Sequence, residues 1–363
     1  MLVCKRFFFY LSGFFLSIIF AVILCEILAR IFFGGIFRND PVLSRNSENA
    51  LNYEGNQFTT FTSFEWSVDI QINSKGFRDN EKIYDSSKNK ILILGDSFTE
   101  GFGVNLEDSF PKKLQQILEQ NNFFFDVLNA GISGNNLVDY IETYKNYFVK
   151  DEKIKVVVIA LYIGNDLIDS YNVRNPENVK KKNITFTLKN FAAENLTLYN
   201  IANRFIKSNP KINKFFVNLG LVHERRILDK YQINNELLKT KVIYSMKLIN
   251  EFQKNINDKK FLLLLIPAKE QIDSNYWNFL VDIQEEKNDK LDVKYSINLI
   301  EQITNEYELK YINLFDIFST YKKEEPLYFK YDPHINALGH ELIANELFKK
   351  IKKFERKNFM YLN

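Results

Sequence analysis

The alternation of apolar and polar positions divides the chain into three stretches. Residues 7–25 form a run of nineteen positions without a charge, and at about 1.5 Å per residue such a run is long enough to cross the hydrocarbon core of a bilayer. A polar, broken stretch follows as far as residue 64, and residues 66–72 then alternate in the manner of a strand. From residue 90 onward, short apolar runs alternate with amphipathic stretches, which is typical of strands and helices that follow one another.

Five of these apolar runs have the length of strands that are buried on both faces. They lie at residues 91–95, 127–131, 155–161, 261–267 and 310–315. Helices are expected at residues 109–120, 137–149, 237–252 and 337–354. This alternation predicts an α/β fold, a doubly wound five-stranded parallel sheet. The third and fourth runs are too far apart for a single crossover helix, so we expect a helical insertion at about residues 170–255.

We therefore divide the chain into a transmembrane anchor at residues 1–38, an accessory strand and turn segment at residues 39–89, and an α/β domain at residues 90–356. A cleaved signal peptide is the alternative to an anchor, but the apolar run exceeds a typical signal peptide and no small-residue cleavage site follows it. The numbers of basic residues before and after the apolar run differ only slightly. Their bias favours a cytoplasmic N-terminus and an extracytoplasmic α/β domain.

Composition and spacing exclude several kinds of function. The 48 Lys and Arg nearly balance the 45 Asp and Glu, so we expect no nucleic-acid partner. Both cysteines, Cys4 and Cys25, fall in the N-terminal apolar stretch, which leaves no thiol nucleophile in the α/β domain. His334 and His340 are six residues apart rather than the three or four of a metal site, and the Gly-Phe-Gly run at 101–103 lacks the third glycine of a dinucleotide site. We expect neither a metal nor a cofactor.

The candidate chemistry follows the apolar runs, because ligands of an open parallel sheet bind beyond the carboxyl ends of its strands. The first run leads into Gly-Asp-Ser at 95–97 and the second ends in Asn-Ala-Gly at 129–131. The third leads to Gly-Asn-Asp at 164–166, and Asp-Pro-His follows the last run at 332–334. Acyl transfer needs a hydroxyl nucleophile, a base, a carboxylate that orients the base and donors for the oxyanion. Each of these roles has a candidate.

The four blocks resemble those of the SGNH hydrolases, the GDSL-type esterase and lipase superfamily, over about residues 91–354. The resemblance implies a flavodoxin-like sheet of SGNH type and an esterase with a serine nucleophile, Ser97. It also implies an oxyanion hole formed by Ser97, Gly131 and Asn165. His334 would then be the base, and Asp332 the carboxylate that orients it.

The last block departs from the family pattern, because one residue rather than two separates its aspartate from its histidine. This spacing is similar to that of membrane-associated SGNH proteins, including alginate-type O-acetyltransferases. Residues 72–79 resemble a stretch that precedes the serine block in anchored members, and residues 266–270 faintly resemble one in the acetyltransferase branch.

Several candidate residues also have a structural interpretation. Gly131 suits a turn that needs positive φ, Asn165 suits a helix cap, and Asn336 an N-cap beside the last block. For Asp96 we expect a structural role, as an acceptor that tightens the loop around Ser97.

The sequence thus predicts a membrane-anchored, single-pass serine esterase. We expect it to hydrolyse an ester, an O-acyl group on an envelope glycan or lipid, through an acyl-Ser97 intermediate. The alternative is O-acetyl transfer to an extracytoplasmic polysaccharide by the same residues, with a multispanning acyltransferase as partner. A third interpretation, an inactive envelope-binding module, is disfavoured because no catalytic position is substituted.

Overall fold

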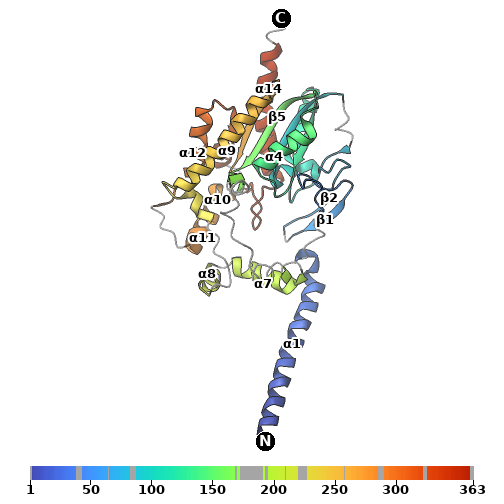
Figure 1. The fold of residues 1–363 in the computed structure, drawn as a ribbon, viewed down its shortest axis with the longest axis vertical. Helices are drawn as coiled ribbons and strands as arrows, with labels where there is room; N and C mark the ends of the chain where they lie inside the picture. Colours follow the sequence, from blue (N-terminus) through green and yellow to red (C-terminus); the bar gives the residue numbers. More distant parts are fainter. Residues whose placement is uncertain are drawn as a thin grey trace. The chain divides into compact units, whose positions relative to one another are not determined.

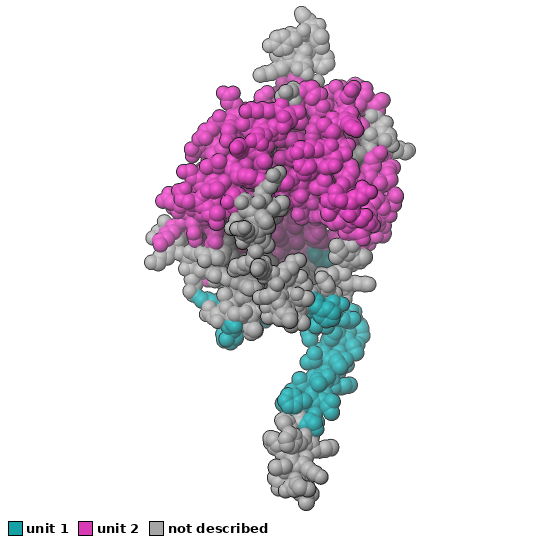
Figure 2. Space-filling view, in the orientation of Figure 1, with its two compact units in different colours: residues 1–42, 62–64, 180–223 teal, residues 43–61, 65–179, 224–363 magenta. Residues whose placement is uncertain are grey.

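The computed structural model describes residues 2–37, 43–63, 65–81, 87–167, 170–171, 191–192, 195–208, 210–219, 227–256, 258–284, 290–321 and 325–359. The chain divides into two compact units, which Figure 2 colours separately. The first comprises Met1–Val42, Thr62–Phe64 and Lys180–His223. The second comprises Leu43–Phe61, Glu65–Val179 and Glu224–Asn363.

The second unit contains a parallel sheet of five strands in the order β4-β3-β5-β6-β7 (Figure 1). The strands are β3 (Asn89–Gly95), β4 (Phe125–Gly131), β5 (Ile154–Tyr162), β6 (Lys260–Ile266) and β7 (Tyr311–Asn313). The strand order reverses between β3 and β5, which places the switch point of a doubly wound fold beside the end of β3. The predicted fold class is confirmed.

Helices cover both faces of this sheet. On one face lie α4 (Leu137–Thr143), the π-helical turn η3 (Tyr144–Phe148), α9 (Glu236–Asn255) and α12 (Tyr295–Glu306). On the other lie α3 (Phe110–Gln120), α13 (Leu314–Ser319) and α14 (Ala337–Phe359). Because side chains of a strand alternate between faces, Leu92 and Leu94 of β3 join the first core and Ile91 and Ile93 the second.

The shorter elements connect this framework. They are the serine-block helix α2 (Ser97–Glu100), η2 (Leu106–Asp108), η5 (Ile227–Tyr231), α10 (Lys269–Ile272) and α11 (Ser274–Gln284). Two expectations need correction. The predicted strand at 310–315 ends at Asn313, because the Asn313 side chain accepts from the Phe315 amide at 2.8 Å and starts α13. The accessory segment contains two paired strands, β1 (Phe58–Thr62) and β2 (Ser67–Gln71), of which only β2 was predicted.

The first unit contains the apolar helix α1 (Leu2–Phe37) and two helices of the insertion, α7 (Thr197–Ser208) and α8 (Pro210–Asn218). Within α1, Ser12–Phe33 is long and apolar enough to cross a membrane, and a signal sequence has the same properties. Residues 172–190 and 220–226 of the predicted insertion lie outside the described residues.

Candidate active site

Ser97 is the first residue of α2, and Asp96 alone separates it from the end of β3. The side chain of Asp96 caps α2 by accepting a hydrogen bond from the Phe98 amide at 2.9 Å. Burial raises the pKa of Asp96 to about 7, although the Phe98 amide and the nearby His334 oppose this change. The cap matches the structural role expected for Asp96, because it fixes the turn that presents the Ser97 hydroxyl.

Three side chains from two distant blocks form a hydrogen-bonded line. Ser97 Oγ lies 2.8 Å from His334 Nε2, and His334 Nδ1 lies 2.6 Å from Asp332 Oδ1. The same carboxylate oxygen accepts the backbone amide of His334 at 2.9 Å. A neutral imidazole that donates from Nδ1 to Asp332 leaves Nε2 free to accept the serine proton. The short aspartate-to-histidine spacing is therefore compatible with this arrangement.

Aromatic rings hold the imidazole of His334 on two sides. The ring centroid of His334 lies 4.8 Å from that of Phe98 and 4.6 Å from that of Phe102. The side chains of His334 and Asp332 remain 17% and 21% exposed. The rings restrict the orientation of the imidazole, part of whose surface stays exposed.

Gly131 ends β4 opposite Gly95 of β3, close to the serine-block helix. A Cβ at Gly131 would lie 2.2 Å from the backbone nitrogen of Glu100, so only glycine allows this approach. The Gly131 amide donates to Asn129 Oδ1 at 3.0 Å. Its predicted role as an oxyanion donor conflicts with this bond, because the amide already has a buried partner. Nor does Gly131 have the positive φ of a turn residue.

The turn that follows β4 contains an amide which the sequence did not single out. Gly134 has a φ of +81°, and among the described residues its backbone N–H has no hydrogen-bond partner. The preceding Ser133 is fixed to α2, because its backbone N–H and its hydroxyl both donate to Glu100 Oε2 at 2.6 Å. The backbone carbonyl of Ser133 accepts from Arg45. A second glycine in a Gly-Ile-Ser-Gly run is the signal that marks this position.

Asn165 lies exposed in the turn after β5. The neighbouring buried Asp166 accepts the Tyr162 amide at 2.9 Å, and Lys230 donates to the Gly164 carbonyl at 3.1 Å. Lys230 is itself paired with Glu270 at 2.8 Å. These bonds fix the turn that presents Asn165, whose role as an oxyanion donor stays a prediction.

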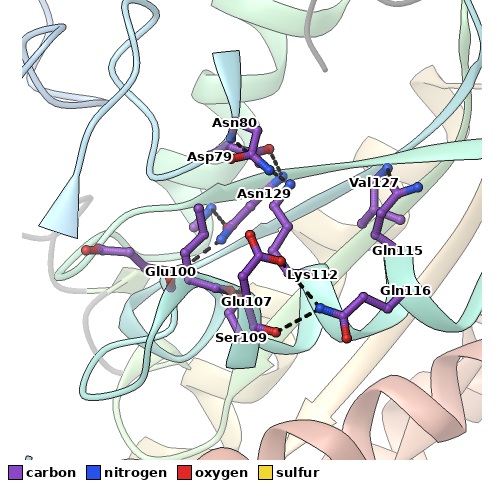
Figure 3. A network of polar contacts seen from close by, with 12 residues as sticks. Asp79, Asn80, Glu100, Glu107, Ser109, Lys112, Gln115, Gln116, Val127 and Asn129 are labelled. Atoms are coloured by element: carbon purple, nitrogen blue, oxygen red, sulfur yellow. Dashed lines mark hydrogen bonds and ion pairs between the residues drawn. The ribbon is translucent and has the colours of Figure 1, made fainter. Parts of the chain in front are cut away.

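Residues 72–79 bind the segments that surround the serine block. The buried Arg78 guanidinium donates to the carbonyls of Gly101 and Val104 at 2.6 and 2.9 Å. The next residue, Asp79, accepts the Asn129 amide at 2.9 Å and forms a buried ion pair with Lys112 of α3 (Figure 3). One short stretch therefore ties together the loop after α2, strand β4 and helix α3.

The loop that carries Asp332 and His334 is held by two charged side chains from elsewhere in the chain. The Glu65 carboxylate accepts the amides of Lys330, Tyr331 and Asp332 at 2.5, 2.8 and 3.0 Å. Lys269, whose pKa is lowered by burial, donates to the carbonyls of Phe329 and Lys330 at 2.8 and 2.6 Å. We call Glu65 and Lys269 the loop clamps. Sequence reasoning missed them, because their partners are backbone groups.

The remaining described histidine, His340, is buried in α14. Its Nδ1 accepts the Phe110 amide at 3.1 Å, at the start of α3. Burial lowers the pKa of His340 to about 3, and the charges of Arg78 and His334 contribute.

Asn336 caps the same helix, α14, since its Oδ1 accepts the amides of Leu338 and Gly339. In the described part of the chain no three His, Cys, Asp or Glu side chains are grouped as a metal site requires.

The profile of the GDSL-like lipase/acylhydrolase family matches residues 91–347, the stretch that contains all four blocks. The chain belongs to this family, and it is a hydrolase that acts on esters.

Solved structures of the same type resemble the chain at low identity. A lipase/acylhydrolase from Enterococcus faecalis is 14% identical, with a TM-score of 0.42 over 73% of this chain and 96% of that one. An acetylxylan esterase from Geobacillus stearothermophilus is 13% identical, with a TM-score of 0.41 over 73% and 95%.

One curated relative matches a shorter region. A tRNA sulfurtransferase from Blochmanniella pennsylvanica is 26% identical over 154 residues, which are 41% of this chain and 31% of that protein. The chain thus spans about a third of the length of that relative. The match assigns no activity to this chain.

Proposed function

We propose that the chain hydrolyses esters through a covalent intermediate on Ser97. His334 Nε2 takes the proton of the Ser97 hydroxyl while Oγ attacks the ester carbonyl. Collapse of the tetrahedral intermediate breaks the ester bond, and the imidazolium returns the proton to the leaving alcohol. Water, deprotonated by the same imidazole, then releases the acid from the acyl-serine. Asp332 orients the imidazole and stabilises its charge.

For the oxyanion we propose three donors: the amides of Ser97 and Gly134 and the side chain of Asn165. The amides of Ser97 and Gly134 have no hydrogen-bond partner within the described residues. The Gly131 amide, in contrast, is bonded to Asn129. Donors that are fixed before the reaction stabilise the negative charge as it develops, without reorganising at that moment.

The observation that carries this proposal is the line from Ser97 Oγ through His334 to Asp332, with contacts of 2.8 and 2.6 Å. A hydrogen bond between nucleophile and base, with the base oriented by a third group, is the geometry that acyl transfer requires. The line also lies past the carboxyl end of β3, at the switch point of the sheet, where such folds bind their ligands.

We further propose that α1 stays in the membrane as a single-pass anchor, with the esterase domain outside the cytoplasm. The substrate would then be an O-acyl group on an envelope glycan or lipid within reach of the bilayer. A carbonate wash of membranes tests the anchor: the full chain should stay in the pellet. Release by the wash, or a mature N-terminus beyond α1, would contradict it.

Release of p-nitrophenol from p-nitrophenyl acetate by the purified full chain tests the catalytic proposal. Ser97→Ala should lower the rate at least about 10³-fold, because it removes the nucleophile. Ser274→Ala is the matched control, since Ser274, like Ser97, is the first residue of a helix, and it is exposed. A folded Ser97→Ala protein with full activity would contradict the proposal.

Mass spectrometry of reactions with and without an oligosaccharide separates hydrolysis from acyl transfer. Hydrolysis predicts free acid in both reactions. An acyl sugar that forms at the expense of free acid, and only when Ser97 is present, would favour the O-acetyltransferase alternative with its multispanning partner.

A further inference from the structure

Helices α7 and α8 of the first unit present apolar side chains on their surface. Phe205 and Phe215 are 62% and 60% exposed. A groove between the two helices is lined by Lys211 and by six apolar side chains: Ala202, Phe205, Ile206, Ile212, Phe215 and Phe216. In each helix the apolar members are three and four residues apart, so they form one face of that helix. This spacing is that of an amphipathic helix.

The start of α7 is bound to α1. Glu26 of α1 accepts the amides of Thr197 and Leu198 at 3.0 and 2.9 Å, which caps α7. Arg30 pairs with Glu26 at 2.8 Å and donates to the Asn195 carbonyl at 2.6 Å. Glu26 directly follows the nineteen uncharged residues 7–25. Helix α7 therefore begins at the level where the uncharged run of α1 ends.

The direction of α7 is set by the same contact. From its capped end, α7 runs across α1 rather than along it (Figure 1). If α1 crosses a bilayer, a helix that runs across it at the end of its uncharged run lies in the plane of the membrane surface.

The charges of the two helices point to one kind of surface. Residues 197–218 contain four basic residues, Arg204, Lys207, Lys211 and Lys214, and no acidic residue. Helices with a basic polar side and exposed aromatic residues bind at the boundary between headgroups and acyl chains, and anionic lipids strengthen this binding by about 1 kcal/mol per basic residue.

We propose that α7 and α8 form a second membrane contact: an amphipathic hairpin that lies in the headgroup region of an anionic phospholipid bilayer, with Phe205 and Phe215 inserted among the acyl chains. This inference rests on the proposed anchor, because α1 brings the hairpin to the membrane. It assigns the insertion to the lipid surface and does not depend on the esterase chemistry.

Depth measurements on the full chain test this contact. The chain is reconstituted into vesicles of phosphatidylcholine and phosphatidylglycerol after Cys4→Ser and Cys25→Ser substitution, and a polarity-sensitive fluorophore is attached to single new cysteines. Ala202→Cys reports on α7 and keeps both phenylalanines in place. Leu16→Cys reports on the anchor. Phe124→Cys is the control, because Phe124 is 79% exposed on the second unit, far along the chain from both.

Brominated acyl chains should quench the labels at residues 16 and 202 at least about twofold more than the label at residue 124, since quenching requires contact with the hydrocarbon boundary. Phe205→Ser with Phe215→Ser should remove the quenching at residue 202 and keep that at residue 16. Circular dichroism checks that each protein keeps its helices.

The outcomes separate the two claims. Quenching at residue 16 with none at residue 202 would overturn the hairpin contact and leave the anchor standing. No quenching at residue 16 would overturn both. The effect of Ser97→Ala on p-nitrophenyl acetate is measured separately, so failure of the esterase proposal cannot be mistaken for either result.

Discussion

The two halves of the candidate active site are built in different ways. Ser97 sits in regular structure: it follows a central strand, opens a capped helix and lies beside the tight approach of α2 to Gly131. His334 and Asp332 sit in an irregular loop, whose backbone is held by Glu65 and Lys269.

This difference suggests a division of tasks. The position of the nucleophile follows from the sheet itself, so disturbing it should cost stability. The position of the base depends on a few hydrogen bonds to its loop, so disturbing these should cost rate with little loss of stability. Substitutions in each half test these two expectations.

Asp332→Asn should have the largest effect, a fall in kcat of about 10³-fold, because the imidazole loses both its orientation and the charge that stabilises its protonated form. Steady-state kinetics with p-nitrophenyl acetate measures this. A thermal midpoint close to that of the unchanged protein is expected, since Asp332 is partly exposed. A rate within about tenfold of the original would show that His334 does not need this carboxylate.

Gly131→Ala should act on the other half and destabilise the protein by about 3 kcal/mol, because its Cβ would overlap the backbone of Glu100. Gly134→Ala is the comparison: its Cβ would make only an ordinary contact, 3.7 Å from Arg45 Nη2, so the positive φ is what opposes it, at about 1–2 kcal/mol. Denaturant unfolding of the detergent-solubilised chain gives both values. Equal losses would mean that the contact with α2 is not what requires glycine at residue 131.

The buried His340 provides a test by pH. The pKa of buried His340 is lowered to about 3, against an ordinary value of 6.5. As the pH falls, His340 therefore takes up its proton in the unfolded chain before it does so in the folded chain. The contribution of His340 to the free energy of unfolding is fully present above about pH 6.5 and is lost as the pH falls toward 3.

Between about pH 7 and about pH 5 this loss amounts to on the order of 2 kcal/mol. His340→Asn keeps an acceptor for the Phe110 amide but has no proton to bind, so the unfolding free energies of the two proteins should converge in this range. A difference that stays constant with pH would contradict the assignment.

Glu65→Gln should have the smallest effect, about a tenfold fall in kcat, or about 1.4 kcal/mol, with KM nearly unchanged. The amide keeps one acceptor oxygen and loses the charge that holds the three loop amides. Glu119→Gln is the matched control, because Glu119 is an exposed glutamate that accepts from Gln115. Equal kcat and KM values for the two variants would show that Glu65 does not help to position the base.

The same contrast explains what could be predicted from the sequence. The sheet and the Ser97 block were predictable because short apolar runs and the residues that follow them are local patterns. The loop clamps were not, since Glu65 lies more than 260 residues from its partners and binds backbone amides, which carry no sequence signal. Strand β1 was missed because Phe58 and Phe61, the apolar positions of Phe58–Thr62, are three residues apart and do not alternate as in a strand.

Gly131 shows a second kind of limit. Two glycines stand three residues apart in the same run, and the sequence does not reveal that the Asn129 side chain occupies the amide of the first. Which amide is left for a ligand depends on a hydrogen bond formed only in the folded chain. The domain boundaries at residues 38, 89 and 356, and the roles of Ser97, Asn165, Asp332 and His334, stay predictions.

Mass spectrometry shows directly whether Ser97 becomes acylated during turnover. The full chain is mixed rapidly with p-nitrophenyl acetate, quenched in acid and digested to locate the modified residue. We expect one added acetyl group on Ser97, which is absent in Ser97→Ala and forms much more slowly in His334→Ala. An active enzyme that carries no acetyl group at any time point, or carries it on another residue, would contradict the acyl-Ser97 mechanism.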